Sequence, residues 1–396
     1  MKRLSFRQRL LMGVTLFSMF FGAGNLIFPP FTGYCAGADA VPAFLGLIST
    51  AVLFPVLGIV ATARAGGMDG LCSKVHPQFS KWFILMIYLC IGPMLAIPRT
   101  ASMAFSMMRF AAASAASVSI GPFTLEQVLA VVFSVIFFAA SRFFAKRPSH
   151  LKDILGKILT PLLLVLVVVL FAGGMFLLPA EAGAARPPYA GAPFAAGFVE
   201  GYNTMDALAA MVFGILIAVN IQDFGLEDAK QLRVETSISG LLAGVVLTIV
   251  YGMLAIVGAR ASAVLPEASD GSVVLSELCR LFFGNAGAVL LAVIFLVACF
   301  NVCTGLLSSC ASFFSKEFPR LSFAAWLNVF TVSGCVISVF GLGFILQISV
   351  PILTLIYPVA LTIIVLNLFP FAFLQKPWVH RIAVIAAFAY SVISML

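Results

Sequence analysis

The feature that most constrains this chain is a series of long apolar segments separated by short polar connections. The hydrocarbon core of a bilayer is about 30 Å thick, so a crossing helix needs about 20 mostly apolar residues. Of the 396 residues, 62% are hydrophobic and only 10% are charged, whereas soluble domains have about 25% charged residues. The sequence therefore predicts an all-α polytopic membrane protein. We expect eleven spanning segments, at about residues 10–34, 41–64, 82–109, 123–143, 154–178, 197–222, 236–260, 285–314, 322–341, 345–369 and 379–396.

The placement of charge predicts how these segments are oriented. If the N-terminus is cytoplasmic, most Lys and Arg residues fall in cytoplasmic connections, and only Arg186, Arg260 and Arg280 fall in external ones. Lys and Arg resist translocation across the membrane. We therefore expect a multi-pass protein with a cytoplasmic N-terminus, and a short external helix over residues 272–283.

The first segment contains a concentration of helix-breaking residues in the stretch 21–30, FGAGNLIFPP. Gly22 and Gly24 weaken a helix, and the two prolines cannot donate backbone hydrogen bonds. A backbone group freed in hydrocarbon costs several kcal/mol unless something binds it. A broken helix that lines a ligand cavity is therefore expected. The alternative is a kinked helix that packs through small residues.

A second such stretch, 197–207 (GFVEGYNTMDA), opens the sixth segment. The two breaks are five segments apart, so they lie in segments of opposite direction, which an inverted repeat requires. Interrupted helices at corresponding places in two halves indicate a transport site. We expect one transmembrane domain over 1–396, with a first repeat at about 10–178, a second at about 197–369 and an accessory helix at about 379–396.

Two charged residues lie inside predicted segments. A charge at that depth costs at least about 2.5–3.5 kcal/mol, so it needs a partner or water. Arg99 lies ten residues from Arg109 at the external edge of the third segment, about 15 Å deep, and Asp206 lies about 13 Å deep in the sixth. We expect the two to face one interior and to interact directly or through the polar end of a substrate. Glu200 is the shallower alternative.

Segment eight carries hydroxyls that could bind a cation. Thr304 and Ser308 are four residues apart and share a helix face. Hydroxyls together with freed carbonyls suit a hard monovalent cation. The alternative is that these hydroxyls bond to carbonyls of their own helix. If this register is wrong, Ser309 or Asn301 is the next choice.

No enzyme and no catalytic residue are expected. The three histidines, His76, His150 and His380, fall in or beside predicted cytoplasmic loops without a Ser, Cys or carboxylate motif. The chain has no P-loop lysine motif, so transport would use an ion gradient, and no ATPase subunit is expected. The expected partners are a small-molecule substrate and the lipid bilayer, and no nucleic acid.

The stretch 21–30, the sequence Pro98-Arg99-Thr100 and residues 200–209 resemble motifs of the bacterial branched-chain amino acid:cation symporters, the livcs family. The resemblance covers nearly the whole chain. It implies sodium-coupled uptake of leucine, isoleucine and valine across the inner membrane. It also implies a leucine-transporter-like fold, with five-plus-five inverted repeats and accessory C-terminal helices. The family usually has a twelfth helix, whereas the printed sequence ends in the eleventh expected segment.

The resemblance also implies a set of site residues. The substrate carboxylate and ammonium would meet backbone amides and oxygens of Ala23, Gly24, Asn25, Tyr202, Asn203 and Thr204. The coupling sodium ion would meet Ser18, Phe21, Thr304 and Ser308. The substrate side chain would lie in an apolar pocket formed by helices one, three, six and eight. Open alternatives are another neutral amino acid, proton coupling through Asp206, or a channel or structural protein that uses the breaks for packing.

Overall fold

The computed structural model describes residues 4–111, 119–120, 123–146, 148–226, 228–265, 267–369, 371 and 373–395, and these are almost entirely helical. The α-helices are α1 (Phe6–Phe20), α2 (Ala23–Ala36), α3 (Ala40–Ile48), α4 (Phe54–Ala65), α5 (Met68–Cys72), α6 (Pro77–Leu89), α7 (Ala96–Ala111), α8 (Leu125–Ala145), α9 (Pro148–Leu177), α10 (Pro193–Glu200), α11 (Asp206–Gln222), α12 (Ala229–Ala261), α13 (Gly271–Glu317), α14 (Phe323–Ser338), α15 (Gly341–Leu368) and α16 (Pro377–Ile393). Short 3-10 turns, η1 (Gly37–Asp39) and η5 (Gly201–Thr204), and π turns, η2 (Ser49–Leu53) and η3 (Cys90–Met94), connect some of them. The strands β1 (Ser119–Ile120) and β2 (Phe123–Thr124) form a small antiparallel pair.

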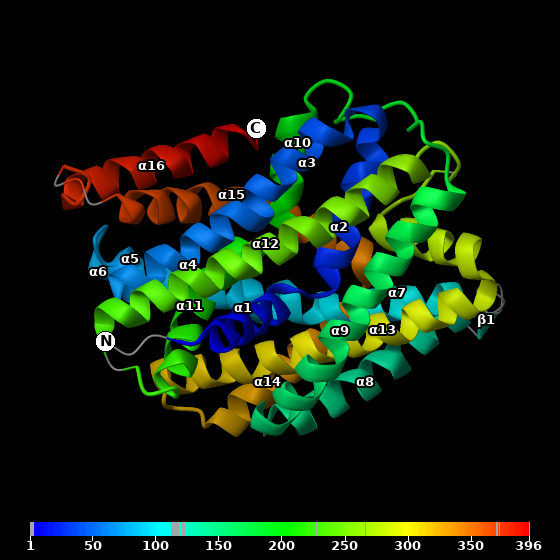
Figure 1. Ribbon diagram of the computed structural model, residues 1–396. Coiled ribbons are helices and arrows are strands. Elements are labelled where there is room, and N and C mark those ends of the chain that lie inside the picture. The colour runs from blue at the N-terminus through cyan, green and yellow to red at the C-terminus, as the bar shows by residue number, and fades with distance from the viewer. Residues whose placement is uncertain are drawn as a thin grey trace.

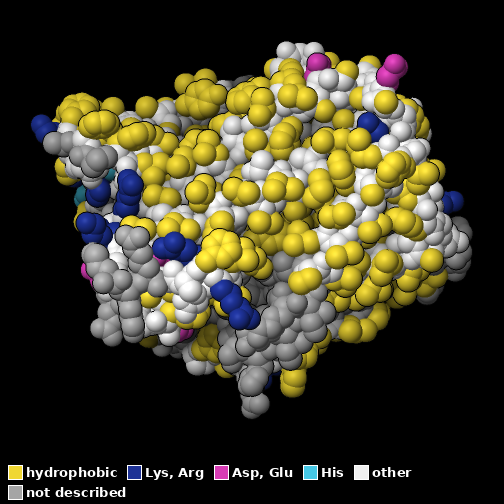
Figure 2. Space-filling view, in the orientation of Figure 1, with side chains coloured by type: hydrophobic (Ala, Val, Ile, Leu, Met, Phe, Trp, Pro, Cys, Tyr) yellow, Lys and Arg dark blue, Asp and Glu magenta, His cyan; other side chains and the backbone are white. Residues whose placement is uncertain are grey.

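Most helices run roughly parallel across the view of Figure 1, with the N-terminus at one end of the bundle and β1 at the other. By length and composition, six helical runs among the described residues could cross a membrane. Large apolar side chains such as Phe176 and Ile385 are exposed, and Figure 2 shows a mostly hydrophobic surface. This surface suits contact with lipid.

The structure contains the first predicted helix break, and the break spans fewer residues than the predicted stretch 21–30. The chain leaves α1 at Phe21, whose backbone is extended, and Gly22 (φ −113°, ψ −171°) leads directly into α2. The prolines Pro29 and Pro30 lie inside α2 and do not end it. The break therefore depends on residues 21–22, and the prolines only deprive two carbonyls of their helical donors.

The second break replaces about one turn between α10 and α11. The turn η5 follows Glu200, and Met205 then takes a left-handed conformation (φ 61°, ψ 12°) before α11 begins at Asp206. Met205 is the one non-glycine residue with positive φ in the described part of the chain. Such a conformation costs about 1–3 kcal/mol and is found most often at functional sites.

The predicted external helix of residues 272–283 is the first part of α13, which bends at Gly284 (φ 63°, ψ −155°) before the eighth segment. The third segment contains an interruption that the sequence analysis did not predict. There α6 and α7 are joined by η3, in which Gly92 is non-helical (φ −100°, ψ −124°) and Pro93 follows.

The two broken segments pack in corresponding ways, each against a helix of the other predicted half. The helices α1 and α2 pack on α12, and α10 and α11 pack on α3 and α4. Each broken segment thus packs on the second segment of the other predicted half, which is a symmetric arrangement of the kind that a pseudo-two-fold axis produces. Both interfaces are close: a Cβ on Gly258 of α12 would overlap the Pro30 backbone, and one on Gly197 of α10 would overlap that of Ala43.

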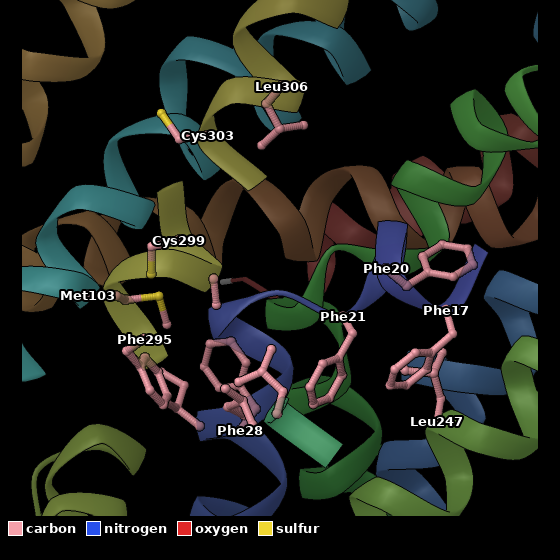
Figure 3. Packing of buried hydrophobic residues seen from close by; sticks show 14 of the residues in the cluster. Phe17, Phe20, Phe21, Phe28, Met103, Leu247, Phe295, Cys299, Cys303 and Leu306 are labelled. Atoms are coloured by element: carbon pink, nitrogen blue, oxygen red, sulfur yellow. The ribbon is translucent and has the colours of Figure 1, made fainter. Parts of the chain in front are cut away.

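The largest buried apolar cluster surrounds the first break. Phe17 and Phe21 stack with ring centroids 4.8 Å apart, and Phe28 lies beyond the break on α2. Figure 3 shows Met103 beside Cys299 of α13, on the side of the break where Phe28 lies. This core holds α2, α7 and α13 around the same point.

Candidate functional site

The two helix breaks meet at a small cavity of about 70 Å³. The first break contributes Gly22, Gly24 and Asn25, and the second contributes Thr204, Met205 and Asp206. Arg99, Thr100 and Met103 of α7, and Val302 and Leu306 of α13, also line it. Segments one, three, six and eight of the sequence analysis therefore line one cavity, as the sequence predicts.

A hydrogen-bonded cluster of three side chains includes Asn25 and Asp206 of the cavity wall and Tyr251 behind them. The amide Nδ2 of Asn25 donates to Asp206 Oδ2 at 2.6 Å and also to Tyr251 Oη. The Tyr251 hydroxyl donates to the same Asp206 oxygen at 3.1 Å. On its other side, Asn25 Oδ1 accepts the backbone N–H of Gly22 at 3.1 Å. The cluster joins α2, α11 and α12, and each of its three side chains is buried.

Arg99 connects both breaks from α7. Its Nη1 donates to the backbone oxygen of Asn203 at 2.6 Å, and its guanidinium carbon lies 5.6 Å from the ring centroid of Phe28. A Cβ on Gly24 would lie 3.2 Å from Arg99 Nη2. The glycine therefore allows the guanidinium to lie close to the first turn of α2.

Arg99 and Asp206 line the same cavity, as the sequence analysis predicts. They do not form an ion pair: the ion pairs in the described part of the chain are those of Arg9 with Glu235 and of Lys81 with Glu317. The Arg99 guanidinium instead bonds a carbonyl of the second break. The two charged residues thus share a cavity without contacting each other directly.

The other predicted residues of the second break have different positions. Tyr202 stacks on Tyr357, with ring centroids 4.4 Å apart, and lies outside the cavity wall. Glu200 is the last residue of α10, and neither Glu200 nor Asn203 is among the residues that line the cavity. Asn203 Oδ1 has no hydrogen-bond partner in the described structure. Thr204 Oγ1 donates to the Gly201 oxygen at 2.9 Å. Of this set, Thr204 lines the cavity. Ala23 is the first residue of α2.

The predicted hydroxyls of α13, those of Thr304 and Ser308, are not among the groups that line the transport cavity. Val302 and Leu306 face the cavity, and Thr304 is two residues from each, about 200° around the helix. The Thr304 hydroxyl donates to its own helix at Phe300 O, 2.8 Å away. Ser308 is likewise two residues from Leu306. Both therefore lie on a different face of α13 from the residues that line the cavity, and their role as sodium ligands stays a prediction.

The alternative residue Ser309 has a better position. It follows Val302 by seven residues, which is two helical turns, so the two share a face. On the same side a Cβ on Gly305 would meet no atom within 4 Å. The other two predicted sodium ligands are at the break itself: Ser18 is in the last turn of α1, and Phe21 is the residue that ends it.

Tyr251 is the site residue that the sequence analysis missed. It lies in the middle of α12, and no polar neighbour or motif distinguishes it from a packing aromatic. Its role becomes visible only through the packing of α12 on α2, which places its hydroxyl against Asn25 and Asp206.

Comparison with solved structures defines the fold. The structure of MhsT in complex with L-phenylalanine matches with a TM-score of 0.65 at 17% identity, covering 100% of this chain and 99% of that one. Mhp1, a nucleobase-cation-symport-1 family transporter, matches with a TM-score of 0.61 at 13% identity, covering 97% and 91%. The fold is therefore the leucine-transporter-like transporter fold that the sequence analysis expects.

The family is shown by sequence. The family model described as branched-chain amino acid transport protein matches residues 5–396, so the chain belongs to this family. The branched-chain amino acid permease BraB of Bacillus subtilis is 34% identical over 391 residues, which are 98% of this chain and 85% of BraB. The branched-chain amino acid transport system 2 carrier protein of Pseudomonas aeruginosa is 34% identical over 389 residues, covering 98% and 86%.

Proposed function

We propose that this protein is a secondary active symporter that imports leucine, isoleucine and valine by alternating access, driven by a sodium gradient. The observation that carries the proposal is the cavity at which both helix breaks meet, with polar groups at the breaks and apolar side chains around them. Family membership supports the substrate class. The excess of Lys and Arg in the predicted cytoplasmic connections supports a bacterial inner-membrane location with the N-terminus inside.

The polar part of the cavity suits the zwitterionic end of an amino acid. The first turn of α2 has free N–H groups and the positive end of a helix dipole, both of which favour a carboxylate. The Arg99 guanidinium lies beside that turn. The Asp206 carboxylate and the carbonyls of η5 are the matching acceptors for an ammonium group.

The rest of the wall suits a branched aliphatic side chain. It is formed by apolar residues on four segments: Phe20, Ile91, Met103, Phe213, Val302 and Leu306. A charged substrate side chain placed there would lose its hydration without a partner. This wall therefore favours neutral apolar amino acids.

The size of the cavity supports alternating access. Ligand pockets commonly have volumes of about 300–1,000 Å³, and this one measures about 70 Å³. An amino acid therefore enters only if the lining helices or side chains move apart. In transporters whose site is formed by broken helices at a repeat interface, one repeat or bundle moves against the other around that site.

The coupling ion has two candidates at this site. Sodium is the proposed ion, and its oxygen ligands would come from the end of α1 and the facing side of α13. A proton on Asp206 is the alternative, favoured by the burial of this carboxylate, of which 3% is exposed, on the cavity wall.

The test is uptake of radiolabelled leucine by the purified protein in proteoliposomes. An imposed inward sodium gradient should drive accumulation, a potassium gradient should not, and a proton ionophore should leave the sodium-driven uptake intact. Leucine inside the vesicles should also accelerate uptake by counterflow. Uptake that is driven by a pH gradient and abolished by the ionophore would replace sodium with a proton, and a flux without saturation or counterflow would indicate a channel.

A further inference from the structure

A second and more open cavity, of about 910 Å³, lies at one end of the bundle, between α4, α12 and the end of α15. We call it the groove. It shares no lining residue with the transport cavity. The described residues around it form a wall of two helix faces. On α12 these are Lys230, Arg233, Val234, Ser237, Ile238 and Leu241, with spacings of three and four residues that place them on one side of the helix.

The residues of α4 that line the groove change from apolar to basic in the same direction as those of α12. Val56, Val60 and Arg64 are four residues apart and line the cavity together. The apolar residues of both helices lie toward the middle of the bundle, and the basic ones lie at its end. The groove is therefore apolar at one end and cationic at the other.

Four cations line the basic end, Arg64, Lys74, Lys230 and Arg233, and no Asp or Glu is among the described lining residues. None of the four belongs to an ion pair found in the described part of the chain. Arg64 Nη1 donates to the carbonyl oxygen of Leu368 at 2.7 Å, and Lys74 Nζ donates to Gln375 Oε1 at 2.6 Å. Burial lowers the pKa of the Lys74 ammonium. The basic end thus concentrates positive charge, with no carboxylate among the described residues that line it.

The apolar end of the groove continues onto the outer surface of α12. Leu241 is 60% exposed, and Val245 and Ile249, one and two turns further along, are 51% and 58% exposed. Figure 2 shows Lys and Arg gathered at the end of the molecule where α12 begins, beside a continuous hydrophobic surface. An occupant of this groove would have an anionic head and an apolar tail.

We propose that this groove binds an anionic phospholipid, with its phosphate among the four cations and its acyl chains along α4 and α12. Basic pockets between transmembrane helices bind lipid head groups through this charge complementarity. Arginine is suited to phosphate because its planar guanidinium can donate two parallel hydrogen bonds. With the N-terminus on the cytoplasmic side, as proposed above, the lipid would come from the cytoplasmic leaflet. The proposal that the groove binds the lipid does not depend on this orientation.

The lipid would contact the helices that support both breaks. The helix α12 packs on α1 and α2, and α4 packs on α11. An occupant that bridges α4 and α12 therefore stabilises one relative position of the two halves. Transport should respond to the anionic lipid content of the membrane through this groove.

The experiment compares lipid binding to the detergent-purified protein by native mass spectrometry, with phosphatidylglycerol and phosphatidylcholine as probes. The test variant is Lys230→Gln with Arg233→Gln. The control variant is Arg7→Gln with Lys316→Gln, which removes the same charge from exposed positions outside the groove. The wild type should retain phosphatidylglycerol at least tenfold better than phosphatidylcholine. The test variant should lose this preference, and the control should keep it within twofold.

Three results would overturn the proposal. Equal loss in both variants would show that surface charge in general attracts the lipid. Binding of inorganic phosphate as tight as that of phosphatidylglycerol would assign the cavity to a soluble anion. A dimer that persists in phosphatidylcholine and is lost in the test variant would assign the groove to a second copy of the chain. Because no amino acid is present, failure of this test is distinct from failure of the proposed transport function.

Discussion

Asn25 Nδ2 donates a hydrogen bond to Asp206 Oδ2 at 2.6 Å, and this bond joins the two helix breaks across 181 residues of sequence. Both residues are buried and both line the transport cavity. The bond thus ties the relative position of α2 and α11 to the chemistry of the site. A change in the hydrogen-bond partners of Asp206 would therefore alter the position of the first turn of α2.

Asn25→Ala should reduce leucine uptake at least tenfold. The substitution removes a donor to a buried carboxylate, and a hydrogen bond to a charged group is worth about 1.5–3 kcal/mol, where 1.4 kcal/mol is tenfold in an equilibrium constant. Tyr251→Phe is the matched control, because it removes one donor to the same oxygen and keeps the ring; its loss should be smaller. Initial rates in proteoliposomes measure both. Wild-type kinetics for Asn25→Ala would separate this cluster from transport.

Gly24→Val should abolish uptake while the protein still inserts into the membrane. A Cβ at this position lies 3.2 Å from both Arg99 Nη2 and the Phe28 ring, so the added methyl groups have no room beside the guanidinium. Gly343→Val in α15 is the control, because a Cβ there meets no atom within 4 Å. Uptake and the amount of inserted protein are measured together. If Gly24→Val transports normally, the stretch 21–30 is only a packing kink.

Substitutions in α13 distinguish between Thr304 and Ser309 as the proposed sodium ligand. Ser309→Ala should weaken the apparent sodium affinity about tenfold, because Ser309 shares a face with Val302, which lines the cavity. Thr304→Val keeps the shape and removes a hydroxyl that bonds Phe300 O, so the sodium dependence should stay close to wild type. Leucine uptake as a function of sodium concentration measures both. A larger loss of sodium affinity in Thr304→Val than in Ser309→Ala would indicate that Thr304 is the ligand.

Competition experiments test the apolar wall of the transport cavity. Isoleucine and valine should compete with leucine, since their side chains differ from it only in the arrangement or number of carbon atoms. Lysine and glutamate should not compete, because side chains such as Phe213 and Leu306 offer no partner to a desolvated charge. Uptake of labelled leucine with each competitor in tenfold excess is the measurement. Strong inhibition by lysine would contradict the proposed pocket.

The positions of the breaks and the shared cavity could be predicted because their signals are local. Glycines beside an amide in an apolar segment weaken a helix wherever they occur, and a charge inside the membrane needs a polar interior. The prolines were harder to interpret. A proline removes only its own N–H, and α2 continues through Pro29 and Pro30 while the carbonyls one turn before them lose their donors.

Other parts of the site depend on contacts between distant segments. The spacing of Thr304 and Ser308 shows that they share a face, but the direction of that face is set by the packing of α13 on α7 and α2. Tyr251 has no local signal either, because an aromatic residue in an apolar helix is compatible with simple packing. Its hydroxyl acquires a role only where α12 meets the first break.

A double-mutant cycle tests the relation between the two buried charges. Arg99 is hydrogen-bonded to the Asn203 oxygen, and Asp206 to Asn25 and Tyr251. The two charged residues line one cavity without a direct ion pair. Removing one leaves the other buried without an opposite charge, which is the costly state. Arg99→Gln and Asp206→Asn should therefore each lose more folded protein than the pair of changes together.

The coupling energy expected for this cycle is about 0.5–3 kcal/mol, the range found for residues that share a network. The yield of monodisperse protein and leucine uptake are measured for each variant. The Arg9 and Glu235 pair serves as a reference cycle, because its charged atoms are 2.6 Å apart and the coupling there is direct. If the Arg99 and Asp206 losses simply add, the two charges act independently, and Arg99 then acts through its bond to the Asn203 carbonyl.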